Sequence, residues 1–80
     1  MARFYFDVED GELVTDNDGT ELGDIDSAKR VGAQLLGELM KTHPHKIWEA
    51  ETFRVVCRDG RGLMLFQMQA LWLPAPAICS

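Results

Sequence analysis

The chain has 80 residues, enough for one domain, with 46% hydrophobic residues and a formal net charge of −5. A chain of this size buries only about 60–65% of the surface that its unfolded form exposes, and oligomerisation is a common way to gain stability. Two cysteines exclude a disulfide-rich scaffold, and the longest apolar run, residues 70–78, is far shorter than the ~20 residues of a membrane span. We therefore expect a soluble cytoplasmic protein without a targeting segment.

Charge is distributed unevenly along the chain. Residues 1–26 contain nine acidic residues and one base, Arg3, for a net charge of −8, whereas residues 27–80 contain seven bases and four acids, for +3. The acidic first third disfavours nucleic acid, and the basic remainder is too sparse for a phosphate-binding stripe. The asymmetry could favour head-to-tail contacts or a basic partner, but we interpret the acidic segment as a solvated hairpin.

The first 22 residues read as a hairpin. Residues 3–8 alternate, with Phe4, Phe6 and Val8 on one face, which predicts a strand. Asp10-Gly11 is a turn signal, because glycine supplies the positive φ that tight hairpins need. A weaker strand is expected over 12–15 and a second turn over 16–19, after which 20–22 lead into a helix.

Residues 24–41 predict the single long helix. Its apolar stripe recurs at steps of three and four residues and consists of Ile25, Ala28, Val31, Leu35, Leu36 and Leu39. Asp24 or Asp26 can cap the first turn, and His43-Pro44 ends the helix, since the residue before proline is pushed out of the α region.

The remainder predicts a linker and a second hairpin. Residues 42–51 are polar, and Ile47 and Trp48 either fold back as an apolar anchor or form a short helical turn. Strands are expected over 51–58 and 63–71, the second with Met64 and Phe66 on one face, joined by a glycine-containing turn over 59–62. Residues 1–71 thus form a single α+β domain, ββαββ, an antiparallel sheet of two hairpins with one helix packed on one face. Residues 72–80 form an apolar tail that contains prolines.

The sheet face opposite the helix is not cleanly polar. The residues expected there or beside it, and therefore at a possible interface, are Tyr5, Val56, Leu63, Leu65 and Trp72. A small monomer seldom exposes such a patch, so a second subunit is expected to cover it and to form a homodimer. The alternative is that the tail folds back over the same face.

Several short motifs resemble a known family. They are the opening Arg3-Phe4-Tyr5-Phe6-Asp7, then Asp10-Gly11, the approach from Asp18-Gly19 through Glu21-Leu22 to Asp24, and the hairpin of Val55, Arg58-Asp59 and Gly62. Together they resemble a family of short uncharacterised bacterial proteins, common in rhizobia and related proteobacteria, over residues 3 to about 69. The resemblance implies the same hairpin–helix–hairpin fold and brings no known activity, cofactor or catalytic residue. The proline-containing ending from Trp72 departs from the family's usual polar ending.

No motif predicts a catalytic residue, a cofactor or a metal site. His43 and His45 could share a metal ion only if further ligands converged, of which Cys79 is one candidate, and we interpret them as part of a polar linker. A calcium loop with Gly19 at its sixth position would place ligands at Val14 and Ile25, which cannot serve. Cys57 lies in a strand whose alternate residues are apolar, where a buried thiol is inert.

The alternative function is binding of an anion or a nucleic acid by the second hairpin. Arg54, Arg58 and Arg61 could form a small basic ridge, although three arginines supply only a modest phosphate contribution. We instead interpret these arginines as part of a solvated sheet face, on which Arg3 and Asp7 pair across strands. We favour a non-enzymatic module that self-associates or binds another protein.

Overall fold

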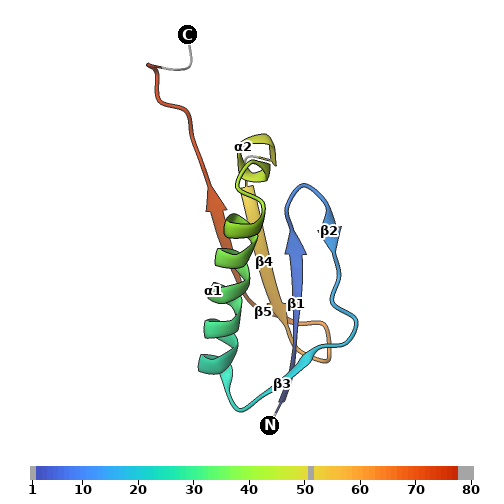
Figure 1. Ribbon diagram of the computed structural model, residues 1–80. Helices are drawn as coiled ribbons and strands as arrows, with labels where there is room; N and C mark the ends of the chain where they lie inside the picture. Colours follow the sequence, from blue (N-terminus) through green and yellow to red (C-terminus); the bar gives the residue numbers. More distant parts are fainter. Residues whose placement is uncertain (1, 51, 78–80) are drawn as a thin grey trace.

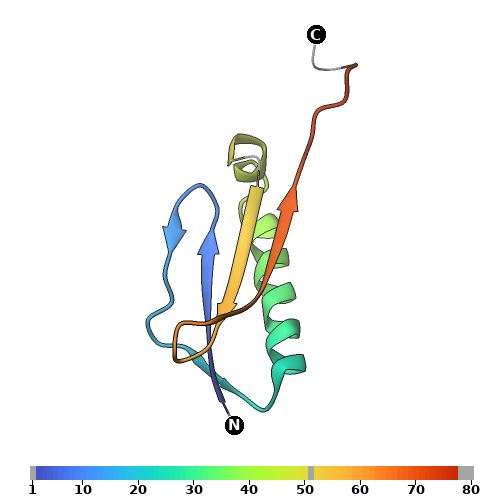
Figure 2. The same ribbon diagram turned by 180° about the vertical axis from the view of Figure 1, so that it is seen from behind.

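The computed structural model describes residues 2–50 and 52–77 and forms a five-stranded antiparallel sheet with one long helix on one face (Figure 1). Its elements are β1 (Ala2–Glu9), β2 (Leu13–Val14), β3 (Thr20–Leu22), α1 (Ile25–Thr42), α2 (Lys46–Ala50), β4 (Thr52–Arg58) and β5 (Met64–Leu71). The strand order is β2-β1-β4-β5, and β3 pairs with the first residues of β1. This confirms the predicted α+β class. The other face of the sheet, which is turned toward the viewer in Figure 2, has no helix on it.

The long helix begins and ends where its capping residues predict. The carboxylate of Asp24 accepts the backbone N–H of Ser27 at 2.8 Å and caps the first turn. At the other end the backbone N–H of His43 donates to the carbonyl of Leu39 at 2.9 Å, one residue before Pro44. The short helix α2 follows at once, and its Ile47 is buried, as the apolar anchor in the linker requires.

The hydrophobic core lies between α1 and the middle of the sheet. Phe53, Val55 and Cys57 of β4 have no exposed surface, because β4 lies between two strands and beneath the helix. Phe4 and Phe6 of β1 are buried beside them, so the period-two alternation assigns these faces correctly. The core is thus centred on β4.

The helix stripe differs from the predicted one at two positions. The buried line of α1 is Ala28, Gly32 and Leu36, whereas Ile25 at the first turn is 40% exposed. Gly32 is buried because the Phe66 side chain of β5 crosses directly beneath it. A Cβ atom at position 32 would lie 3.0 Å from Cε1 of Phe66. The absent side chain therefore lets a large aromatic ring pass under the helix.

The second strand of the first hairpin is interrupted. β2 pairs with Val8 and Glu9, and β3 pairs with residues 2–4, so the segment between them bulges away from the middle of β1. Residues 20–22, which the sequence pattern places in a lead into the helix, form β3 instead. The carboxylate of Asp16 takes the place of the missing strand, because its Oδ2 accepts the backbone N–H of Phe6 at 3.1 Å.

The second hairpin contains a β-bulge at its turn end. Val56 pairs with Gln67 and Cys57 with Phe66, but Arg58 pairs with Met64, which leaves Leu65 as an extra residue in β5. Met64 therefore does not share the helix-facing side with Phe66, as simple alternation predicts, and it is 56% exposed. Regular pairing of β5 with β4 therefore begins at Phe66.

Replacement of Gly19 by alanine is expected to destabilise the first hairpin. Gly19 has a φ of +73°, and a Cβ atom there would lie 2.8 Å from Cγ of Arg3 and 2.9 Å from Cε2 of Tyr5. Gly19→Ala should lower the free energy of unfolding by about 1–2 kcal/mol, measured by urea denaturation. Gly23→Ala is the matched control, because no atom lies within 4 Å of its Cβ position. A loss of equal size in both variants would contradict this explanation.

Candidate functional site

The strand β5 forms one outer edge of the sheet. β5 pairs with β4, and no other strand in the described ranges pairs with its second edge. Residues 64–71 contain neither charge nor proline, two of the devices that protect edge strands, although the bulge at Leu65 interrupts the end next to the turn. The opposite edge of the sheet differs, because β2 has two residues and is followed by the acidic residues Asp16 and Asp18. The β5 edge is therefore the longer of the two outer edges and has no charged residue along it.

Exposed apolar side chains gather along β5 and its two ends. The exposed fractions are 57% for Leu63, 56% for Met64, 41% for Leu65, 56% for Leu71 and 82% for Leu73. Between Leu65 and Leu71, the amides of Gln67 and Gln69 occupy the same side and are exposed. We call Leu65, Gln67, Gln69 and Leu71 the β5 row.

The residues predicted for an interface lie in four different places, and Trp72 is alone in one of them. Tyr5 and Val56 lie on the helix-free face but are half-buried, and the guanidinium of Arg58 stacks over the Tyr5 ring with its Cζ 4.9 Å from the centroid. Leu63 belongs to the turn, where its N–H donates to Oδ1 of Asp59 at 3.0 Å. Leu65 belongs to the β5 row. The helix-free face is thus largely polar over β1 and β4, whereas along β5 leucines lie at both ends of the row and uncharged amides in its middle.

Trp72 lies on the opposite side from the position expected for it. Its indole N–H donates to the carbonyl of Ile47 at 2.9 Å, and its ring packs against Trp48 at a tilt of 57°, with the ring centroids 5.2 Å apart. The side chain therefore packs between the end of the sheet and α2, because the alternation along β5 turns residue 72 toward the helix side. Trp72 joins the hydrophobic core and is not part of the exposed β5 row.

The tail does not cover the helix-free face. From Leu73 to Ala77 the chain continues past the end of β5, away from the sheet (Figures 1 and 2). These five residues are all exposed. The alternative in which residues 72–77 fold back over Tyr5, Val56 and Leu65 is thus not observed, and residues 78–80 lie outside the described part.

A polar network fills the interruption in the first hairpin. Asp7 accepts Nε of Arg58 at 2.7 Å and the backbone N–H of Asp16 at 2.9 Å. A guanidinium nitrogen of Arg58 also donates to the carbonyl of Asp16 at 2.7 Å. Oδ1 of Asp16 accepts the backbone N–H groups of Asp18 and Gly19, each at 3.0 Å. These bonds hold the bulged segment against β1 and β4, which is a structural role.

The network shifts the titration of both carboxyl groups in the same direction. The hydrogen bond from Arg58 is the main reason that the pKa of Asp7 lies below its ordinary value. For Asp16, burial alone would raise the pKa, but the three backbone N–H donors lower it below the ordinary value. Both groups are therefore stabilised as carboxylates by folding.

Each arginine of the predicted basic ridge has a carboxylate partner. Arg54 pairs with Glu9 at 2.8 Å, Arg58 with Asp7, and Arg61 with Asp59 of its own turn at 3.0 Å. Arg3 pairs with Glu21 at 3.1 Å, so it does not pair with Asp7 as the strand pattern suggests. An incoming anion would have to compete with these carboxylates, which disfavours the ridge as a phosphate site.

The histidines and the described cysteine lie in positions that do not favour metal binding or thiol chemistry. Within residues 2–50 and 52–77 no three His, Cys, Asp or Glu side chains are grouped as metal ligands would be. His43 and His45 are exposed after α1, and Cys79, the candidate third ligand, lies outside the described residues. Burial raises the pKa of the Cys57 thiol, which keeps it protonated and unreactive.

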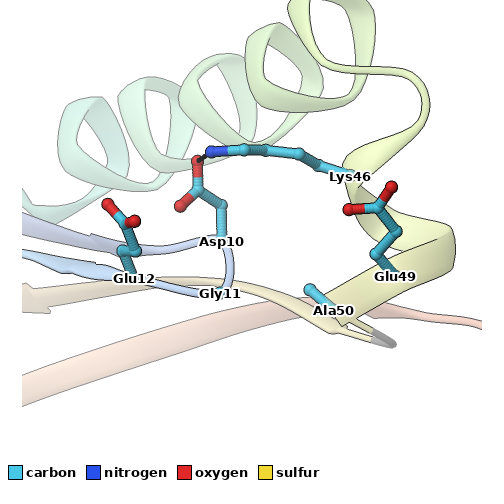
Figure 3. Close-up of a pocket in the computed structure, with 6 residues that line it drawn as sticks. All are labelled: Asp10, Gly11, Glu12, Lys46, Glu49 and Ala50. Atoms are coloured by element: carbon cyan, nitrogen blue, oxygen red, sulfur yellow. Dashed lines mark hydrogen bonds and ion pairs between the residues drawn. The ribbon is translucent and has the colours of Figure 1, made fainter.

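A shallow cleft of about 270 Å³ lies between the β1–β2 turn and α2 (Figure 3). Asp10, Glu12 and Glu49 line it together with Lys46, whose Nζ lies 3.3 Å from a carboxylate oxygen of Asp10. The ion pair attaches α2 to the first hairpin. We interpret this ion pair as a structural contact. The remaining charged side chains that line the cleft, those of Glu12 and Glu49, are acidic.

The comparisons with known proteins give a family and no activity. The family model described as a domain of unknown function (DUF6894) matches residues 3–71. No curated protein and no solved structure matches the chain. None of the helices in the described ranges is long and apolar enough to cross a membrane.

Acid is expected to destabilise the first hairpin through Asp7 and Asp16. Because both pKa values lie below their ordinary values in the folded chain, the stabilisation is complete above the unfolded-state pKa and is lost as the pH falls through the folded-state pKa. The free energy of unfolding should therefore fall between about pH 5 and pH 2. Asp7→Asn should cost about 1–3 kcal/mol at pH 7 and flatten this dependence.

Chemical denaturation at a series of pH values measures both effects. Asp18→Asn is the matched control, because its side chain is exposed in the same segment. An unchanged slope in Asp7→Asn would show that the pair with Arg58 does not govern the acid sensitivity.

Proposed function

The chain belongs to the DUF6894 family, a domain of unknown function, and we propose that it is a small protein-interaction module that self-associates and carries no catalytic step. The observation that supports this proposal is the open, uncharged edge strand β5 with exposed apolar side chains along its length. Such an edge presents unpaired N–H and C=O groups, which another strand can satisfy while it covers the leucines.

The thin stability of a short chain supports the same proposal. One helix covers one face of the sheet, and the core that it seals is centred on β4. Leu65 and Leu71, at the edge, remain outside that core. Burial of exposed leucines against a second chain contributes roughly 25 cal/mol for each Å² of apolar surface removed from water. Association would thus add stability that the single chain lacks.

Protein contact is favoured over the other functions considered. The guanidinium groups of Arg54, Arg58 and Arg61 are occupied by carboxylates, so the anion-binding alternative has no free cationic cluster behind it. The buried thiol of Cys57 and the exposed position of the two histidines offer no activated nucleophile or base. We place this activity in the cytoplasm, where a free thiol such as Cys57 stays reduced.

Self-association is tested directly by light scattering and sedimentation. The chain has a mass of 9.0 kDa, and we expect twice that mass at ~100 µM chain concentration. Leu65→Lys combined with Leu71→Lys should shift the protein to the monomer, because the four lysines of a dimer would bring like charges together where the edges meet.

The matched control places the same two charges on the other edge. Leu13 and Val14 of β2 are 65% and 59% exposed, so Leu13→Lys combined with Val14→Lys should leave the mass at twice that of the chain. A wild-type protein that stays monomeric at this concentration would refute the proposal. A dimer that only the β2 substitutions disrupt would move the interface to that edge.

A further inference from the structure

The β5 row has a symmetry of its own. From Leu65 to Leu71, alternate residues read leucine, glutamine, glutamine, leucine, which is the same in both directions about Met68. The pattern continues outward in sequence to Leu63 and Leu73. A strand that reads the same both ways can face a copy of itself with like residues opposite like residues.

We propose that two copies of this chain pair β5 with β5 in antiparallel fashion, with Met68 facing Met68 on a two-fold axis. The inference deepens the proposed self-association, on which it rests, by naming the occupant of the edge as a second copy and by fixing the register. The result is one continuous antiparallel sheet through both chains, with both α1 helices on the same face. A two-fold axis perpendicular to the sheet is the symmetry that produces this arrangement.

The register follows from which side chains would face each other. Directly opposite residues in an antiparallel pair point to the same face, so the axis must pass through a residue position. With the axis at Met68, Leu65 faces Leu71 and Gln67 faces Gln69 of the other copy. An axis at Gln67 would place Leu65 against Gln69, and an axis at Gln69 would place Leu71 against Gln67. Only the axis at Met68 matches leucine with leucine and amide with amide.

The helix side of β5 accommodates the same register. There Phe66 would face Ala70 of the other copy, a large residue against a small one. Phe66, Met68 and Ala70 are each only partly buried, so the single chain leaves part of their surface free. A second strand at this edge would cover that surface as well as the leucines.

The paired segment has a defined beginning and end. The bulge at Leu65 and the turn glycine Gly62, with a φ of +87°, stop the regular strand on one side. Pro74, which has no N–H to donate, stops it on the other. No charged residue lies between Gly62 and Pro74, so no like charges meet when the two copies pair.

The flank of α1 above β5 leaves room for the second helix. Leu35 and Leu39 line an apolar groove with Val8 on the β1 side of the helix, so the opposite flank faces the β5 edge. At helical spacing that flank carries the small residues Ala33 and Gly37 together with the longer side chains of Lys29 and Met40, all of them exposed. No atom lies within 4 Å of the Cβ position of Gly37. Small residues there allow two helices to approach across the axis.

Cysteine cross-linking in the full chain tests the register. Gln67→Cys and Gln69→Cys are made separately in a Cys79→Ser background, and the buried Cys57 is retained. The chains are mixed, equilibrated and oxidised with a copper–phenanthroline catalyst. In the proposed register the two new cysteines are directly opposite in a mixed dimer, whereas identical cysteines are diagonal and about 7–8 Å apart, beyond disulfide reach. We expect about tenfold more disulfide-linked dimer in the mixture than in either chain alone.

The outcomes separate this inference from the proposed function. Linkage of Gln67→Cys alone would place the axis at Gln67, and linkage of Gln69→Cys alone would place it at Gln69; either overturns the register. A dimer by light scattering that links in none of the three samples overturns β5 pairing but leaves self-association standing. A monomer refutes both. Leu65→Cys mixed with Leu71→Cys is the second pair, and it should link in the mixture to the same extent.

Discussion

The contact between α1 and β4 is the interaction on which the rest of the structure depends. It is where the long helix covers the sheet, and Phe53, Val55 and Cys57 have no exposed surface there. In the described part of this short chain, α1 is the one long helix that can cover the sheet. The sheet is therefore covered on one face, and the groups on the helix-free face and along the β5 edge need other contacts. Over β1 and β4, charged side chains on the helix-free face form ion pairs with each other. The strand β5 has no charged residue, and no other element in the described ranges covers its outer edge.

The interrupted strand shows how a side chain can replace a stretch of backbone. Asp16 accepts the N–H of Phe6, which a continuous strand would have paired with a carbonyl, and its second oxygen organises the loop around Gly19. Arg58 completes the arrangement from β4 through Asp7 and through the Asp16 carbonyl. The acidic residues of the first hairpin are thus not uniformly solvated charge. Two of them are acceptors that the fold requires.

Much of the fold could be predicted because its signals are local. The period-two faces of β1 and β4, the cap at Asp24 and the stop before Pro44 each depend on a few neighbouring residues. What could not be predicted depends on contacts between distant segments: the burial of Gly32 over Phe66, the pairing of β3 with β1, the bulge opposite Arg58, and the packing of Trp72 on α2. The symmetry of the β5 row was present in the sequence, but the alternation alone does not show that this strand lies at the edge of the sheet, which follows from the strand order.

The open edge also has a consequence for how much of the folded protein a cell maintains. A strand that is completed by a second copy couples folding to mass action, so dilution lowers the free energy of unfolding and accumulation raises it. Dilute chains would unfold more often and be degraded sooner, whereas abundant ones would persist. The bare leucines of β5 would in that way let the protein's own abundance set its lifetime.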